Sequence, residues 1–109
     1  MGKTSRDKGK RGELELAHEL TRLGIECRRG QQYCGASGDA DVVGVPGVHI
    51  ECKRTETLRL NEAMAQARRD ARDGEVPVVI HRRNRGPWIV VMDLGDWVGM
   101  YVKDERSKA

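Results

Sequence analysis

Six residues near the middle of the chain, VHIECK at 48–53, constrain the fold more than any other segment. Apolar and polar residues alternate there, as in a half-buried β-strand whose successive side chains point to opposite faces of a sheet. One face is apolar, and the other carries His49, Glu51 and Lys53. A carboxylate and an ammonium group on one strand face are compatible with a solvated sheet surface or with an active site.

The flanking segments predict an α/β fold, with a mixed β-sheet flanked by helices. A helical pattern begins at Gly12 and stops at Gly24, and an amphipathic helix is predicted over 58–73 with Gly74 as its C-cap. Pro46 and Gly47 suit a type II turn between two strands of a hairpin. Further strands are expected at 25–29, 76–81 and 88–93. The segment 94–102 is compatible with a short helix or an edge strand.

The length of 109 residues predicts one domain. Residues 1–11 are polar and charged, so we expect a flexible basic arm without structure of its own, followed by a single domain at 12–109. The GASGD segment within 25–40 predicts a mobile loop. Since the chain has no Phe and only 4% aromatic residues, its core must consist of Val, Leu, Ile, Ala and Met.

The Lys and Arg residues occur in four clusters, at 3–11, 28–29, 68–69 and 81–85, although the net charge is only +3. A solvated surface explains each cluster taken alone, but the set of four favours a nucleic-acid partner. Three Cys at irregular spacing without a signal peptide predict a reducing, cytoplasmic setting. No apolar run approaches the length of a membrane span.

Three acidic residues fall where they can meet Lys53. Glu13 lies on the apolar stripe of the first helix, although its place at a helix start would also explain an acid there. Asp41 opens one strand and Glu51 lies on the next. Metal-assisted phosphodiester hydrolysis needs such a set, because Mg²⁺ binds carboxylate oxygens and keeps several waters, while a Lys can orient a water and offset charge on the phosphate.

The pattern D41-(x)9-E51-C-K53, after a helix that opens with KGKRGELEL, resembles the PD-(D/E)xK nuclease superfamily, and specifically the archaeal-type Holliday-junction resolvases and their phage relatives. The resemblance covers roughly Lys8 to Asp93, with Ala40 where the superfamily name has Pro. It implies a restriction-endonuclease-like core that binds Mg²⁺, with Mn²⁺ as a substitute. The implied metal ligands are Glu13, Asp41 and Glu51, and the implied catalytic residues are these three with Lys53 and, more weakly, Ser37.

The resemblance also implies a function, the nicking of four-way DNA junctions in recombination. Because one small chain presents one site, paired cuts require a C2 homodimer. The expected phosphate-binding residues are Lys8, Lys10, Arg11, Arg28, Arg29, Arg82, Arg83 and Arg85. Two alternatives stay open: a nuclease of this fold that cuts other branched or linear DNA, and a non-catalytic DNA-binding module.

The hairpin raises a question of register. A plain two-residue turn would pair Val45 with Val48 and therefore Asp41 with Cys52, which places Asp41 on the opposite face from Glu51. We therefore predict a bulge or an odd-length loop between Asp41 and Glu51.

Several other residues have ordinary interpretations. A zinc site of Cys27, Cys34, Cys52 and His49 would lack any CxxC pair, so ordinary cysteines are expected. We expect His49 to be a partly solvated structural residue, although it shares the face of Glu51. Gln66 lies on the flank of the second helix, near the predicted site but outside the predicted set. Trp88 and Trp97 are expected to anchor the core or a dimer interface.

Overall fold

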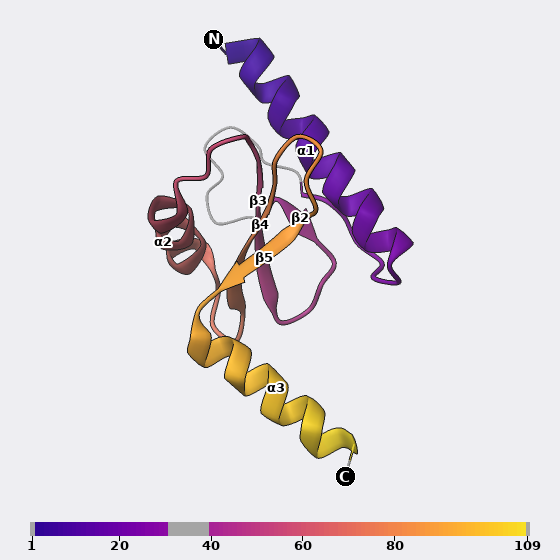
Figure 1. The fold of residues 1–109 in the computed structure, drawn as a ribbon, viewed down its shortest axis with the longest axis vertical. Helices are drawn as coiled ribbons and strands as arrows, with labels where there is room; N and C mark the ends of the chain where they lie inside the picture. The colour runs from indigo at the N-terminus through magenta and orange to yellow at the C-terminus, as the bar shows by residue number, and fades with distance from the viewer. Residues whose placement is uncertain (1, 31–39, 109) are drawn as a thin grey trace.

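The computed structural model describes residues 2–30 and 40–108, with side chains from Lys8 onward. It has three helices and a five-stranded mixed sheet, which confirms the predicted α/β class and is compatible with a restriction-endonuclease-like core (Figure 1). The elements are α1 (Gly2–Arg22), β1 (Arg28–Arg29), β2 (Val42–Val43), β3 (Val48–Arg54), α2 (Leu60–Asp70), β4 (Val76–Arg82), β5 (Ile89–Met92) and α3 (Leu94–Lys108).

The strands follow the chain order β1-β2-β3-β4-β5 across the sheet. Only β3 and β4 pair in parallel, with Glu51 beside Val79, and α2 makes the crossover between them. The other three pairs are antiparallel. Since β3 and β4 are the two longest strands and lie in the middle of the sheet, they form the frame on which the site is built.

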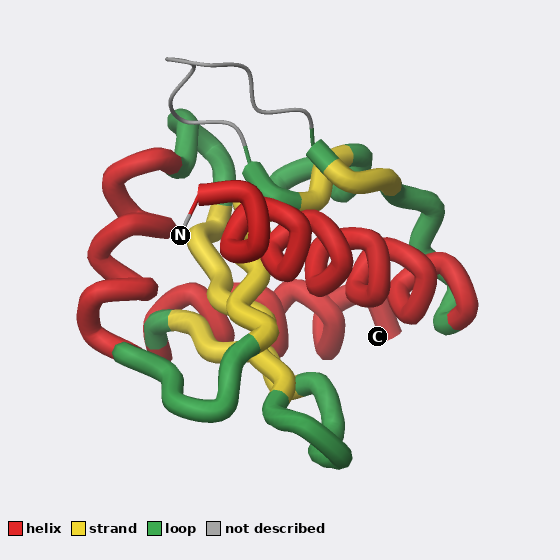
Figure 2. Tube along the Cα trace, turned by 90° about the horizontal axis from the view of Figure 1, so that it is seen from above, coloured by secondary structure: helices red, strands yellow, loops and turns green. Residues whose placement is uncertain are grey.

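Two helices cover opposite faces of this sheet, and the strands run between them (Figures 1 and 2). Leu16 and Ala17 of α1 pack in one cluster with Val42, Ile50, Val78 and Ile80. Ala63, Met64 and Ala67 of α2 pack on Val79 in a second cluster. The aliphatic composition of the buried core agrees with the prediction from the sequence.

The helix α1 begins at Gly2, so the prediction of an unstructured arm and of a helix start at Gly12 is wrong for residues 2–11. That segment contains no Pro, and extending an existing helix is far easier than nucleating one. At the other end, Gly24 has φ +104°, the Ile25 N–H donates to Leu20 O and the Gly24 N–H donates to Thr21 O. This Schellman-type ending confirms the predicted stop.

The amphipathic helix α2 is shorter than predicted and ends at Asp70. Its C-cap is Ala71 in an extended conformation, so the predicted cap at Gly74 is wrong. Gly74 instead takes a positive φ of +85° in the connection that leads to β4. The early stop brings the end of α2 close to β3, where Asp70 approaches the site.

The hairpin contains the predicted irregularity. The Val48 N–H donates to Val45 O across Pro46 and Gly47, and Gly47 has the φ of +81° that a type II turn requires. However, Val42 pairs with Ile50, so Val43 and Gly44 together lie opposite His49. Gly44 has φ +97° at this bulge. The bulge brings Asp41 level with Glu51.

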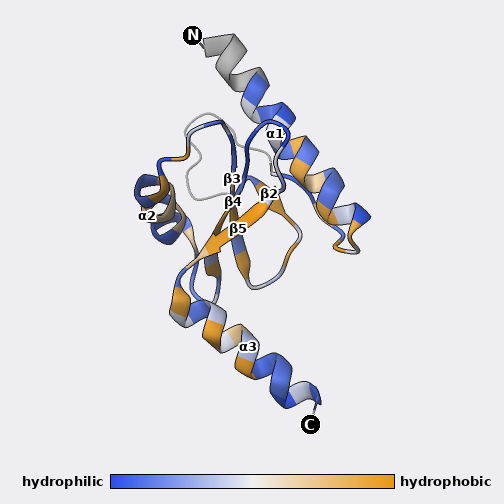
Figure 3. Ribbon diagram, in the orientation of Figure 1, coloured by the Kyte–Doolittle hydropathy of each residue, from blue (hydrophilic) through white to orange (hydrophobic). Residues whose placement is uncertain are grey.

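The last fifteen described residues form α3, which settles the choice left open for the tail in favour of a helix. It has no buried residue and extends away from the sheet, on the side remote from α1 (Figure 1). Its first half is mainly apolar and its second half mainly polar (Figure 3). Among the described helices, none is both long and apolar enough to cross a membrane.

Candidate metal-dependent nuclease site

Four of the five residues predicted to be catalytic line one cleft of about 470 Å³, and the fifth, Ser37, lies outside the described residues. Glu13 comes from α1, Asp41 precedes β2, and Glu51 and Lys53 lie on β3. Lys8 of α1 and Gln66 of α2 also line it. Two segments that are distant in the sequence, α1 and the β2–β3 hairpin, therefore bring three carboxylates and two ammonium groups to one opening.

Asp41 is held by the backbone of the neighbouring strand. Its Oδ2 atom accepts a hydrogen bond of 2.8 Å from the Cys52 N–H, and its own N–H donates to Ile50 O at 2.9 Å. The residue is only 7% exposed. Because both bonds depend on the shifted register of the hairpin, the bulge at Gly44 positions this carboxylate.

Glu51 is the most buried acid of the cleft, with a side chain 2% exposed. Burial, and after it the negative charge of Asp41, raise the pKa of Glu51 to about 7. A hydrogen bond from His49 opposes this shift. Two carboxyl groups that disfavour each other's charge at a cleft are a suitable place for a divalent cation, which would stabilise both ionised forms.

Glu13 shares an ion pair with a residue that we predicted to bind DNA. The Arg29 Nε atom lies 2.9 Å from Glu13 Oε1, and the two side chains are 25% and 17% exposed. Burial raises the pKa of Glu13, as does the charge of Asp41, while Arg29 lowers it. In this structure Arg29 therefore orients an acid of the cleft.

Lys53 donates a hydrogen bond to Gln66 Oε1 at 3.4 Å. Gln66 was left outside the predicted site. The signal that could have included it is helical spacing, because Gln66 lies next to the buried Ala67 and one turn beyond Ala63, at the edge of the face that packs on the sheet. Gln66 thus orients the ammonium group from the opposite side of the cleft.

His49 is fully buried, so the expectation of a partly solvated residue is wrong. Its Nε2 atom lies 2.8 Å from Glu51 Oε1, and its Nδ1 atom lies 3.8 Å from Glu75 Oε1. Ligand atoms of His49, Glu51 and Asp70 also lie within 4.8 Å of one another. The strand alternation placed His49 on the face of Glu51, but it could not show that Asp70 and Glu75 would approach this face.

Two sets of residues around Glu51 carry metal-ligating groups, and of these His49, Glu51 and Asp70 have ligand atoms within 4.8 Å of one another. Glu13, Asp41 and Glu51 supply only carboxylates and open to the cleft, which suits a hard ion such as Mg²⁺ that keeps water ligands. His49, Glu51 and Asp70 include an imidazole that is already hydrogen-bonded to Glu51. The two sets differ in access from solvent, because Glu13 and Asp41 line the cleft whereas His49 is buried beside Glu51.

Among the predicted phosphate-binding residues, the described side chains fall into two groups. Arg29 and Arg82 are partly buried and paired, the latter through Nη1 to Glu15 Oε1 at 2.7 Å. The others are exposed, with Lys8 at the cleft itself. These are Lys8, Lys10, Arg11, Arg28, Arg83 and Arg85.

The cysteines and tryptophans that the structure describes lie mainly against the core. Cys27 and Cys52 are free thiols packed against the core. Burial raises the pKa of Cys52 to about 12, so Cys52 is not a reactive nucleophile. Trp88 also packs against the core, whereas Trp97 is 51% exposed on α3. Ser37 and Cys34 lie outside the described residues.

A mixed sheet that aligns a helix Glu, a strand Asp and an E-x-K strand at one cleft is the arrangement of the PD-(D/E)xK nucleases. A family model described as phage putative PDDEXK endonuclease matches residues 4–108, and the chain belongs to that family. Searches of curated proteins and of solved structures gave no significant match.

Proposed function

We propose that the protein is a metal-dependent, structure-selective DNA endonuclease of the Holliday-junction resolvase type, which nicks four-way junctions by phosphodiester hydrolysis. The observation that carries the proposal is the meeting of Asp41, Glu51 and Lys53 at one cleft that Glu13 also lines. Family membership supports an endonuclease. The junction as substrate is the more specific part of the proposal.

Each predicted catalytic residue of the cleft has a role in this mechanism. Glu13, Asp41 and Glu51 would hold Mg²⁺, or Mn²⁺ in its place, which when bound supplies a Lewis acid and a water of lowered pKa. Lys53, held by Gln66, orients the attacking water and offsets negative charge that builds on the phosphate. His49 donates to Glu51 Oε1 and so directs the other oxygen of Glu51 toward the cleft.

The exposed basic residues would bind the DNA backbone. Lys8 lines the cleft, and Lys10 and Arg11 follow it on α1, whose N-terminal end extends beyond the sheet (Figure 1). Arg28, Arg83 and Arg85 add exposed charge at β1 and in the β4–β5 loop. Such contacts recognise charge and shape more than base sequence. Arg29 and Arg82 would join them only by exchanging their carboxylate partners for phosphates.

The proposal also includes a homodimer and a location in the cell. The described chain has one cleft with the complete residue set, so paired cuts at a junction need a homodimer. We also propose a cytoplasmic location, where DNA would be available as the substrate.

A second candidate is a nuclease with the same cleft that cuts other branched or linear DNA. The observation that favours it is the family description, which specifies an endonuclease but no junction. The same residues would carry the chemistry, so only the substrate separates the two. A non-catalytic DNA-binding module is the weaker alternative, because it would not require Glu13, Asp41, Glu51 and Lys53 to line one cleft.

The test compares cleavage of an immobile four-way junction with cleavage of a linear duplex of the same arm sequence, in Mg²⁺ or in EDTA. Paired, symmetric nicks in the junction alone, abolished by EDTA, are the expected result. Equal metal-dependent cutting of both substrates would support the second candidate and contradict the resolvase. Binding of DNA without any metal-dependent cutting would contradict both nucleases.

A further inference from the structure

The helix α3 presents an apolar stripe that nothing in the described chain covers. Leu94, Trp97, Val98, Tyr101 and Val102 follow the 3-and-4 spacing of one helix face. Leu94 is 75% exposed, Trp97 51% and Tyr101 52%. The rings of Trp97 and Tyr101 stack with centroids 5.4 Å apart. An isolated fifteen-residue helix is marginally stable in water, so this stripe needs a partner surface.

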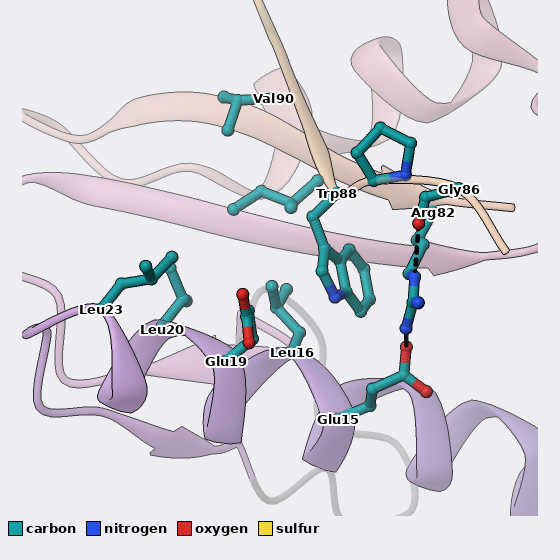
Figure 4. Close-up of a pocket in the computed structure, with 11 residues that line it drawn as sticks. Glu15, Leu16, Glu19, Leu20, Leu23, Arg82, Gly86, Trp88 and Val90 are labelled. Atoms are coloured by element: carbon teal, nitrogen blue, oxygen red, sulfur yellow. Dashed lines mark hydrogen bonds and ion pairs between the residues drawn. The ribbon is translucent and has the colours of Figure 1, made fainter.

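A groove that is mainly apolar, like the stripe on α3, lies between α1 and the β4–β5 side of the sheet (Figure 4). It measures about 460 Å³, and Glu15, Glu19 and Arg82 contribute charged groups to its lining. Its apolar lining includes Leu16, Leu20, Leu23, Ile80, Pro87, Trp88 and Val90. Trp88 points across it toward α1 (Figure 4). Leu23 is 62% exposed and Val90 59%, so the groove is open along its length. Apolar residues this exposed mark an interaction site.

The groove and the stripe agree in length. The stripe from Leu94 to Val102 is about 12 Å long at the rise of an α-helix, and the apolar residues of α1 from Leu16 to Leu23 span about 10 Å. Beyond Val102 the helix becomes charged, with Lys103, Asp104, Glu105 and Arg106 in sequence. Only the apolar half of α3 would therefore need to be covered.

The α3 helix of the same chain is turned away from this groove. One residue, Asp93, separates β5 from α3, and Arg68 of α2 holds it through two hydrogen bonds of 3.0 and 2.6 Å. Figure 1 shows α3 leaving the sheet on the side remote from α1. The short, anchored connection leaves the groove to another molecule.

We propose that the groove binds the α3 helix of a second copy of this chain, and that the exchange is reciprocal. Each copy carries both the stripe and the groove, so a two-fold axis satisfies both apolar surfaces at once. Trp97 and Tyr101 are about half exposed, so at about 150–250 Å² per aromatic side chain the two contacts would bury roughly 400 Å² of ring surface. The aliphatic residues of the stripe and the facing groove add to this area, toward the size of a standard stable interface.

This inference rests on the proposed function, because it identifies the surface of the homodimer that paired nicking requires. Its test measures mass rather than cleavage. The dimer contact can therefore fail while the nuclease assignment stands, and loss of nuclease activity would leave the dimer contact untouched.

The experiment determines the mass of the full chain by sedimentation over a range of concentrations. We expect a dimer of twice 12.2 kDa for the wild type. Trp97→Glu, on the stripe, and Leu23→Glu, in the groove, should each raise the dimer dissociation constant by about a hundredfold or more, because a carboxylate would be buried in an apolar contact. Ser107→Glu adds the same charge on the opposite face of α3 and should leave the dimer intact.

A mixture of the two disruptive variants separates helix-in-groove docking from other dimers. The Trp97→Glu chain keeps an intact groove and the Leu23→Glu chain keeps an intact helix, so mixing them should recover a heterodimer through one of the two contacts. Both substituted residues are largely exposed in the single chain, so circular dichroism should show retained sheet structure. A monomeric wild type, or a dimer that Leu23→Glu leaves unchanged, would overturn the proposal.

Discussion

The Nε2 atom of His49 lies 2.8 Å from Oε1 of Glu51, and both side chains are 2% exposed. Glu51 therefore has one oxygen occupied by a buried imidazole. Asp41, across the shifted hairpin, lies close enough for its charge to raise the pKa of Glu51. The arrangement explains how a deeply buried acid can keep a fixed orientation in the site that we propose to bind a cation.

Removal of the His49 donor should destabilise the fold. His49→Leu leaves the Glu51 carboxyl group buried without this hydrogen bond, and we expect a loss of about 2 kcal/mol in the free energy of unfolding. His49→Gln keeps a donor at a similar position and should lose less. Urea denaturation of both variants measures the difference. Equal losses would show that packing volume, rather than the hydrogen bond, gives His49 its importance.

The stability of the metal-free protein should depend on pH through Glu51. The pKa of Glu51 is raised to about 7 in the folded chain from an ordinary value of 4.5, so the folded state binds a proton more tightly than the unfolded state. The free energy of unfolding should therefore fall as the pH rises from about 5 to 8, by at most about 3 kcal/mol. Urea titrations in EDTA at several pH values measure this slope.

Glu51→Gln is the control for this pH dependence, because it keeps the shape of the side chain and removes its titration. The slope between pH 5 and 8 should become flatter in this variant. If the slope is unchanged, other groups cause the pH dependence and the burial of Glu51 has no such consequence.

Divalent cations should stabilise the folded protein at neutral pH. A bound ion would offset the repulsion between Asp41 and Glu51, and at ten times its dissociation constant it adds about 1.4 kcal/mol. Thermal unfolding with Mg²⁺ or Mn²⁺ should show a higher Tm that EDTA reverses. Asp41→Asn should abolish the increase, whereas Glu26→Gln, an exposed acid away from the cleft, should retain it. An increase of equal size in Asp41→Asn would place the ion elsewhere.

Gly44 should be required for the register that positions Asp41. Its φ of +97° disfavours any side chain, and an added Cβ would lie 3.3 Å from the Cys27 Cα atom. We expect Gly44→Ala to cost about 1–2 kcal/mol of unfolding free energy and to weaken the stabilisation by Mg²⁺. Gly99→Ala, where nothing lies within 4 Å of the added Cβ, should be neutral or stabilising. Similar behaviour of the two variants would contradict the role of the bulge.

Much of the frame of the site follows from the sequence alone. The alternation at 48–53 placed Glu51 and Lys53 on one face of a strand, and helical periodicity directed Glu13 toward the core. A regular two-residue hairpin would put Asp41 on the opposite face, so the sequence required a bulge or an odd-length loop in the hairpin. These are local rules, in which the identities of neighbouring residues determine the direction of a side chain.

The contacts that the sequence did not show depend on tertiary packing. His49 is buried because Asp70 and Glu75, which lie more than twenty residues further along the chain, approach it from the end of α2 and the start of β4. Arg29 reaches Glu13 because β1 lies beside α1. No periodicity within either segment carries that information.

The most direct test of the central claim, that this cleft hydrolyses DNA, is the single-turnover rate of strand cleavage by Glu51→Gln in saturating Mg²⁺. We predict a loss of about a thousandfold or more relative to the wild type, with DNA binding retained, and a rate near that of the wild type for Glu26→Gln. A Glu51→Gln protein that folds and still cleaves within a few-fold of the wild-type rate would contradict the account.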